Sequence, residues 1–237
     1  MPLRSSVTIV VSPRPRVGKT LLARMLVDFH LHEGREVAAF DLNQGDGTLA
    51  QFLPERTTSA GVVDVAGQIA LFDRLVADDG VAKVIDLGNE SFASFFAVAE
   101  QLGFIEEASK HEIVTAILFV LTPDASSIEA YGTLNKRFAG ALLSPVHNEI
   151  LGPAPHRGKY PLGRGALLLR MPLLAPGLRK YIAKAPFSFA DTGADSGIPA
   201  DFGVELQHWR RRMHIECREL MLRLLLADLS AAIRFVS

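Results

Sequence analysis

Cysteine is almost absent from this sequence, and long hydrophobic runs are missing. Cys217 is the only cysteine in 237 residues, so no disulfide can form within the chain, which is typical of proteins from a reducing compartment. The longest apolar run covers 113–121 and is interrupted by Thr115, well short of the roughly 18 residues that a membrane-spanning helix needs. The apolar stretch 7–11 near the N-terminus is also too short for the core of a signal peptide. We therefore expect a cytoplasmic protein.

An excess of charge of one sign is also missing. Lysine and arginine number 25 against 26 aspartates and glutamates, which gives a formal net charge of -1. Any contact with nucleic acid or acidic lipid therefore requires a local basic patch, because the whole chain exerts no long-range attraction. The seven histidines do not show the spacing of metal ligands, and no Ser-His-Asp pattern is present. The sequence thus gives no sign of a histidine metal centre or a serine triad.

The order of the apolar segments indicates an α/β protein. Hydrophobic residues make up 49% of the chain and charged residues 22%, and 237 residues suffice for a sizeable core. Short β-branched runs alternate with segments in which apolar residues recur every three or four positions. We expect strands at 7–11, 37–42, 82–87, 115–121, 141–147 and 166–170, and helices at 20–32, 69–76, 92–102, 125–138, 178–184 and 204–235. This pattern predicts one domain over 1–237, a doubly wound, mostly parallel sheet with helices on both faces.

Three segments fall outside this alternation. The pattern is weak at 48–67, where we expect only short helical or irregular pieces. Two glycine-rich segments, 152–165 and 187–203, are loops by composition, and the first of them also carries several prolines and positive charges. Their composition does not indicate a role.

The first strand is followed by a loop suited to binding phosphate. Residues 12–20 read Ser-Pro-Arg-Pro-Arg-Val-Gly-Lys-Thr and lead into a helix, an order typical of phosphate-binding loops. Gly18 lets the backbone approach a phosphate, Lys19 supplies charge to the β- and γ-phosphates, and the Thr20 hydroxyl can ligate Mg²⁺. The start of the helix adds unpaired amides and the positive end of its dipole. A plain Walker motif, however, has glycine where this chain has Pro13.

The loop, the helix and the next strand resemble the ParA/MinD family of P-loop ATPases, whose deviant Walker motif runs Lys-Gly-Gly-x-Gly-Lys-Thr. With Gly18-Lys19-Thr20 aligned, Pro13 falls on a position that the family leaves variable. Arg14 falls on the signature lysine, which in the family reaches across a dimer to the partner's ATP. The resemblance implies the P-loop NTPase fold, ATP and Mg²⁺ as cofactors, and a nucleotide-dependent homodimer.

Two positions of the loop depart from the family. Its two glycines fall on Pro15, which lacks an N–H and has a fixed φ, and on Arg16, which adds a Cβ and a charge. A loop altered in this way has either kept its nucleotide or lost it, and we expect binding. By the resemblance, the residues that hold the nucleotide are Pro15, Arg16, Val17, Gly18, Lys19, Thr20 and Leu21, and Arg14 and Lys19 act on the phosphates.

The end of the second strand resembles the family's Asp-x-Asp-Pro-Gln-Gly stretch. Asp41 matches the first carboxylate, and Gln44 and Gly45 match the glutamine and glycine after a one-residue deletion. Asn43 stands in place of the second carboxylate, which the family uses to orient or deprotonate water, and an amide cannot accept that proton. We therefore expect slow hydrolysis or none. An ordinary Asx turn also explains Asn43 and Gly45, but it leaves a buried Asp41 unexplained.

Two further strand ends carry polar residues that match the family. Asp86 follows Lys83-Val84-Ile85 and fits the Walker B position, where a carboxylate holds Mg²⁺ through water. Asn148 follows the strand expected at 141–147 and matches an asparagine with which the family reads adenine. A strand-ending asparagine is also a common turn residue.

The last expected helix offers two surfaces. Arg210, Arg211 and Arg212 form a basic run that could contact the DNA backbone, as ParA-like dimers commonly do. Downstream, the helix is apolar on most faces over 221–235, and Asp228 and the small number of cations make membrane contact less favoured than packing. We expect packing on the sheet or on another subunit, with DNA or protein as possible partners.

These residues favour a ParA/MinD-like ATP-binding dimerisation switch that positions, partitions or transfers DNA or a cellular machine. A binding or scaffold module that has lost hydrolysis or nucleotide remains an alternative. A metabolic enzyme of related fold, such as a dethiobiotin synthetase or cobyrinate amidase relative, is a third. The stretch from Asp41 to Gly45 argues against the metabolic enzyme.

Overall fold

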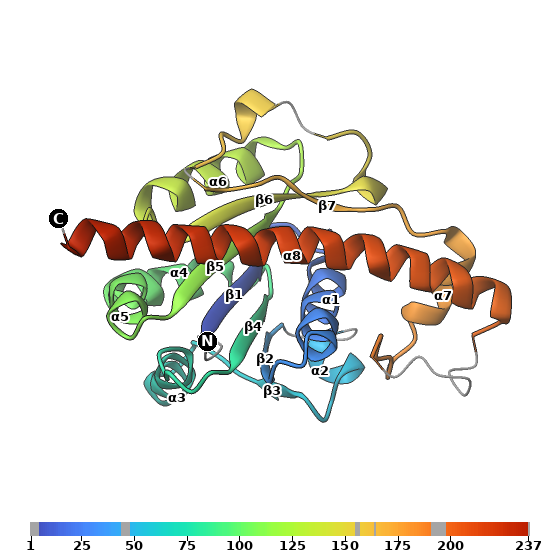
Figure 1. Ribbon diagram of the computed structural model, residues 1–237, viewed down its shortest axis with the longest axis horizontal. Coiled ribbons are helices and arrows are strands. Elements are labelled where there is room, and N and C mark those ends of the chain that lie inside the picture. Colours follow the sequence, from blue (N-terminus) through green and yellow to red (C-terminus); the bar gives the residue numbers. More distant parts are fainter. Residues whose placement is uncertain (1–4, 44–47, 155–156, 164, 191–197, 237) are drawn as a thin grey trace.

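A computed structural model describes residues 5–43, 48–154, 157–163, 165–190 and 198–236 (Figure 1). Seven parallel strands form one sheet in the order β3-β2-β4-β1-β5-β6-β7. The strands are β1 (Ser6–Val11), β2 (Val37–Leu42), β3 (Thr57–Ser59), β4 (Ala82–Leu87), β5 (Val114–Val120), β6 (Leu142–Asn148) and β7 (Leu169–Met171). From β1 the chain goes first to β2 and to β3 at one edge and then returns to β4 beside β1. It afterwards crosses to the other side of β1 and continues outward through β5, β6 and β7.

Helices cover both faces of this sheet (Figure 1). The helices are α1 (Lys19–His32), α2 (Leu49–Phe52), α3 (Val65–Leu75), α4 (Phe92–Gln101), α5 (Phe104–Lys110), α6 (Ala125–Arg137), α7 (Pro176–Ile182) and α8 (Ala200–Val236). Alternate strand residues point to opposite faces. Val10, Val84 and Leu118 therefore pack with α1, α2, α7 and α8, whereas Ile9, Ile85 and Ile117 pack with α3 to α6.

These observations confirm the doubly wound sheet expected from the sequence. The sheet differs from expectation mainly at its edges. The strand expected at 166–170 is only Leu169–Met171, because Ala166 N–H donates to Gly163 O and holds the preceding segment in a turn. The strand β3 and the helix α2 occupy the weakly patterned segment 48–67, and the helix α5 was not expected.

Two helices begin earlier than their apolar pattern indicates. The helix α3 starts at Val65 instead of 69, since the Asp64 side chain accepts from Gly67 N–H and caps it. The helix α8 starts at Ala200 instead of 204 and runs to Val236, across the front of the sheet in Figure 1. In the described residues no helix is both long and apolar enough to cross a membrane.

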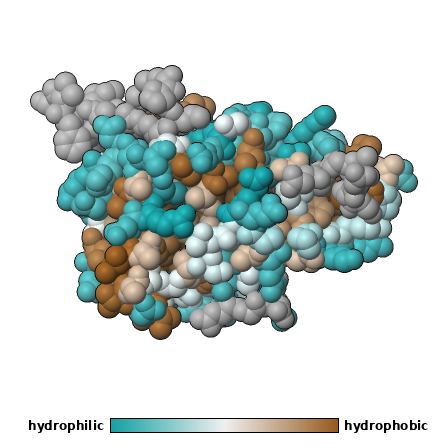
Figure 2. Space-filling view, turned by 90° about the horizontal axis from the view of Figure 1, so that it is seen from below, coloured by the Kyte–Doolittle hydropathy of each residue, from teal (hydrophilic) through white to brown (hydrophobic). Residues whose placement is uncertain are grey.

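The surface is mixed in character. Seen from below Figure 1, the molecule is hydrophilic over much of its face, and hydrophobic atoms gather toward one end (Figure 2). The exposed large apolar residues include Val63 and Val65 before and at the start of α3, and Ile215 and Leu222 on α8. Single exposed apolar side chains are normal on protein surfaces and do not by themselves indicate a binding site.

Candidate functional site

The loop from β1 to α1 contains two residues with a left-handed backbone, Arg16 and Gly18. Gly18 is left-handed, with φ 97, and its carbonyl accepts from Leu22 N–H at 3.0 Å as α1 begins. A Cβ at Gly18 would lie 2.5 Å from Asn148 Nδ2, so only glycine fits there. Arg16 has φ 57, a conformation that favours glycine. The loop thus keeps a glycine-like backbone where the sequence has arginine.

The side chain of Lys19 lies inside this loop. It is 6% exposed, and its Nζ donates to the carbonyl of Arg14 at 2.9 Å. Burial lowers the pKa of Lys19, while Asp86 and Glu90 act in the opposite direction. The ammonium is therefore held within the loop by a neutral acceptor that a phosphate oxygen can replace.

Asp86 lies directly beside the start of α1. Thr20 Oγ1 donates to Asp86 Oδ2 at 2.6 Å, and Asp86 is fully buried at the end of β4. Burial raises the pKa of Asp86 to about 7, and the nearby Asp41 carboxylate acts in the same direction. Within the described residues, Asp86 Oδ1 has no hydrogen-bond partner. A buried carboxylate oxygen beside a threonine hydroxyl suits Mg²⁺, which prefers oxygen ligands and keeps several waters.

Asp41 and Asn43 form a second polar group at the carboxyl ends of the strands. Asp41 pairs with Asp86 in the register of β2 and β4. Asp41 Oδ1 accepts from the amide nitrogen and the side chain of Asn43, at 3.0 and 2.9 Å, and Asp41 Oδ2 accepts from Ala50 N–H at 2.7 Å. The Asn43 side chain also donates to Asp86 O at 3.1 Å. Asn43 therefore acts as a donor that joins the ends of β2 and β4.

Asn148 contacts the loop itself. Its Nδ2 donates to Val17 O at 2.9 Å, and its Oδ1 accepts from Ile150 N–H at 3.3 Å. Asn148 is 5% exposed. These bonds fix the loop against the end of β6, and contact with adenine stays a prediction.

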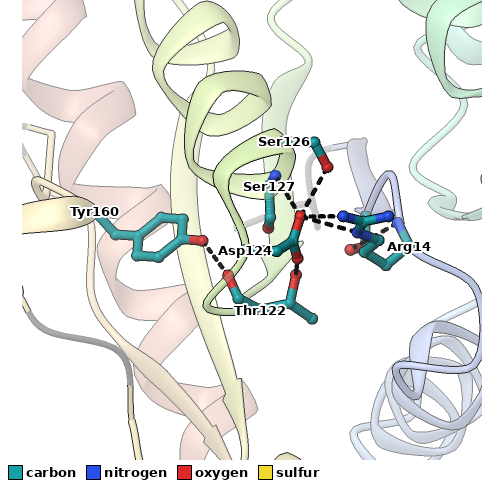
Figure 3. A network of polar contacts seen from close by, with 7 residues as sticks. Arg14, Thr122, Asp124, Ser126, Ser127 and Tyr160 are labelled. Atoms are coloured by element: carbon teal, nitrogen blue, oxygen red, sulfur yellow. Dashed lines mark hydrogen bonds and ion pairs between the residues drawn. The ribbon is translucent and has the colours of Figure 1, made fainter.

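Arg14 is bound within its own chain (Figure 3). Its Nε and Nη2 donate to Asp124 Oδ1 at 2.9 and 2.5 Å. Asp124 caps the N-terminus of α6, where its side chain accepts from Ser127 N–H at 3.2 Å. Pro15 is exposed, and Leu21 is half-buried in the first turn of α1.

The chain is similar in structure to solved MinD proteins at low sequence identity. The septum site-determining protein MinD from Pyrococcus horikoshii, complexed with Mg-ADP, has a TM-score of 0.54 and 15% identity, covering 92% of this chain and 97% of that one. The chain has the P-loop NTPase fold. The MinD cell division protein of Aquifex aeolicus has a TM-score of 0.49 and 16% identity, covering 88% and 96% of the two chains. No protein-family model and no curated protein sequence matches the chain.

Within this P-loop NTPase fold, the three arginines expected to contact DNA do not share one environment. Arg210 makes a bidentate pair with Asp28 of α1, with Nε–Oδ2 and Nη2–Oδ1 both 2.7 Å. His214 lies 2.7 Å from the same Asp28 carboxylate. Arg210 therefore fastens α8 to α1, whereas Arg211 and Arg212 are exposed.

The other expected site residues named here lie together at the carboxyl ends of the inner strands. Thr20, Asp41, Asn43 and Asp86 are linked through the hydrogen bonds described above. Lys19 interacts with Asp86 through charge alone. Gln44 and Gly45 lie outside the described residues.

Sequence reasoning missed Asp124. It follows a strand and precedes Ser126-Ser127, which signals a helix cap. Only the sheet order, which places β1 beside β5, reveals that it meets Arg14.

Proposed function

We propose that this chain is a ParA/MinD-like nucleotide switch that binds ATP with Mg²⁺. The observation that carries the proposal is the meeting of Lys19, Thr20 and a buried, incompletely bonded Asp86 at one loop. Lys19 would exchange the Arg14 carbonyl for phosphate oxygens, and the amides at the start of α1 would contact the same phosphates. Thr20 and Asp86 would hold Mg²⁺, the latter through water, and the ion would neutralise phosphate charge.

The same site favours slow hydrolysis. A general base must accept a proton from the attacking water, and the side-chain nitrogen of Asn43 is already donating to Asp41 and to Asp86 O. Asp41 already accepts three hydrogen bonds, two at Oδ1 and one at Oδ2, so its oxygens are engaged within the fold. ATP would therefore persist once bound, and the switch would reset slowly.

Dimerisation would be the output of nucleotide binding. The resemblance implies a face-to-face homodimer in which Arg14 contacts the partner's phosphates, presenting a surface to DNA or to a protein partner. An arginine can make this contact bidentately, because its planar guanidinium matches phosphate geometry. Positioning, partition or transfer of DNA or a cellular machine is the role that we propose for this dimer.

A thermal-shift titration with ATP and ADP, each with and without Mg²⁺, tests nucleotide binding. We expect a concentration-dependent rise in Tm for the wild type that is larger with Mg²⁺, because ligands that bind only the native state stabilise it. Lys19→Ala should abolish the rise. Lys110→Ala is the matched control, since Lys110 is 71% exposed and pairs only with Glu107 among the described contacts. A wild-type Tm that no nucleotide changes would contradict the proposal.

A binding module without hydrolysis is the second candidate. Pro15, which removes an N–H from the loop, and Asn43, which cannot act as a base, both favour it. Phosphate release measured alongside the titration separates the two functions. A Tm rise with turnover near that of ordinary ATPases would exclude the binding module without hydrolysis. The same result would also exclude slow hydrolysis by the switch.

A further inference from the structure

The long helix α8 carries an apolar stripe on the side that faces away from the sheet. The stripe consists of Val204, Ile215, Leu222 and Leu226, which are 75%, 62%, 55% and 49% exposed. Eleven, seven and four residues separate them in turn, close to three, two and one helical turns, so they lie on one side of the helix. Within the described residues no other element covers this side of α8, which faces the viewer in Figure 1.

The opposite side of α8 is already packed. Met213, Cys217, Leu220 and Leu224 are buried in the core that α8 shares with α1 and the sheet. Four, three and four residues separate these positions, the spacing that buries one side of a helix. The apolar stripe does not belong to this core. A helix with one apolar side packed and a second one exposed has a surface suited to another apolar partner.

Charges of both signs border the apolar stripe on one flank. Glu219 and Arg223 lie one turn apart there, and Arg223 Nη2 donates to Glu219 Oε1 at 3.4 Å. An acidic residue beside the stripe is unfavourable for anionic lipid, which attracts helices rich in cations. A glutamate and an arginine on the same flank instead suit a partner that offers these two charges in the reverse order.

A second copy of α8 offers the reverse order when it runs antiparallel. With a two-fold axis near residue 221, Ile215 lies opposite the partner's Leu226, and Leu222 lies beside the partner's Leu222. Such an axis sets each flank against the same flank of the partner, so Glu219 faces the partner's Arg223 and the reverse. Positions 215 and 226 have almost the same midpoint as 219 and 223. One register therefore satisfies the apolar and the charged contacts together.

We propose that α8 is a self-association surface through which two copies of this chain pair antiparallel, apolar stripe against apolar stripe. A parallel pair is disfavoured, because it would set Arg212 beside the partner's Arg211. The stripe faces away from the sheet, whereas the phosphate-binding loop lies at the carboxyl ends of the strands. Pairing through α8 therefore needs no nucleotide and does not depend on the proposed switch.

Sedimentation equilibrium without nucleotide tests the pairing. We expect the wild type to form dimers at concentrations up to about 0.2 mM. Leu222→Glu should raise the dimer dissociation constant at least about tenfold, because it brings two carboxylates together at the centre of the interface. Val63→Glu is the matched control, since Val63 is 87% exposed and lies before α3. A monomeric wild type, or a dimer that Leu222→Glu weakens no more than Val63→Glu does, would overturn the inference.

Cross-linking tests the antiparallel register. A disulfide requires Cβ atoms about 4 Å apart, so a mixture of Ile215→Cys and Leu226→Cys proteins should form the mixed disulfide on mild oxidation. Each variant alone should cross-link far less. Cys217 does not interfere, because it is fully buried. Disulfides that form as readily within either variant alone as in the mixture, or no mixed disulfide, would overturn the inference.

Co-sedimentation with phosphatidylglycerol vesicles separates self-association from contact with lipid. We expect the wild-type dimer to stay in solution, because its apolar stripe is covered by the second copy. A wild type that is monomeric and binds the vesicles, with binding lost in Leu222→Glu, would assign the stripe to a lipid surface and overturn the inference.

Discussion

Gly18 is the residue on which the geometry of the loop depends most closely. It combines φ 97 with a Cβ position 2.5 Å from Asn148 Nδ2, and Asn148 in turn fixes Val17 O. A side chain at Gly18 would therefore strain the backbone and displace the group that holds the loop. Both effects act at the start of α1, where phosphate is proposed to bind.

We expect Gly18→Ala to destabilise the protein by about 2–4 kcal/mol, from the left-handed backbone and the steric overlap together. Gly34→Ala is the control, because Gly34 has φ 68 but nothing lies within 4 Å of its Cβ position. That variant should cost only about 1–2 kcal/mol. Urea unfolding measures both free energies, and equal losses would show that the contact with Asn148 contributes nothing.

His30 makes stability depend on pH. The ring is fully buried, and neither nitrogen has a hydrogen-bond partner within the described residues. Burial, together with the charge of Arg35, lowers the pKa of His30 to about 3. The unfolded chain binds this proton near the ordinary value of about 6.5. The stabilising contribution of neutral His30 is thus complete above that value and is lost progressively as the pH falls toward about 3.

We expect His30→Leu to reduce the loss of stability below pH ~6 by up to about 1.4 kcal/mol per pH unit. Urea midpoints measured between pH 7 and pH 4 for the wild type and His30→Leu check this. His111→Leu is a suitable control, since that side chain is 48% exposed. Parallel pH curves for wild type and His30→Leu would contradict the assignment.

At the scale of elements, one ion-pair cluster fastens the last helix to the first. Asp28 of α1 is 2% exposed and accepts hydrogen bonds from Nε and Nη2 of Arg210, with His214 beside it. Arg218 of α8 also pairs with Glu33 at the end of α1, at 2.7 Å. The C-terminal half of α1 is therefore tied to α8 by ion pairs.

We expect Arg210→Ala to cost about 3 kcal/mol, because it leaves the Asp28 carboxylate buried without its bidentate partner. Arg211→Ala should change the free energy of unfolding by no more than about 0.5 kcal/mol, since Arg211 is exposed. Guanidinium denaturation of both variants provides the comparison. Similar losses for the two would show that the Asp28 cluster does not stabilise the α1–α8 contact.

Prediction from the sequence succeeded where periodicity is strong and failed where contacts are non-local. The strands β1, β2 and β4 and the order of loop, Asp41 and Asp86 follow from β-branched runs and motif spacing. The start of α3 depends on a cap outside its apolar pattern, and the pairing of Arg14 with Asp124 depends on the sheet order. The use of Arg210 inside the fold was equally hidden, because a run of arginines does not show which of them meets a buried carboxylate.

At the scale of the whole molecule, the balance of charge limits DNA contact. The formal net charge is -1, and Arg210 is used internally. Exposed Arg211 and Arg212 are what remains of the expected basic run. Contact with the DNA backbone stays a prediction. It depends on these two side chains and on a dimer that would present them twice.

We expect binding to duplex DNA in Mg-ATP to be independent of sequence and strongly weakened by salt. Replacing both Arg211 and Arg212 by alanine should lower the slope of log affinity against log salt by about 2 per protomer. Alanine at Lys136 and Arg137, two exposed cations of α6 on the other side of the sheet, provides the control. Fluorescence anisotropy across a salt series measures the slopes, and equal slopes for both double variants would refute a DNA-binding role for this run.

The order of strands also affects folding during synthesis, because the first strand pairs with strands that are made later. The wholly buried strand β1 pairs with β4 and β5, so Ser6 lies opposite Ala82 and Val114. At about 5–20 residues per second, β1 leaves the ribosome on the order of 5–15 seconds before β4 is complete. During synthesis this apolar strand has no partner of its own, and it is the segment of the nascent chain that chaperones are expected to protect.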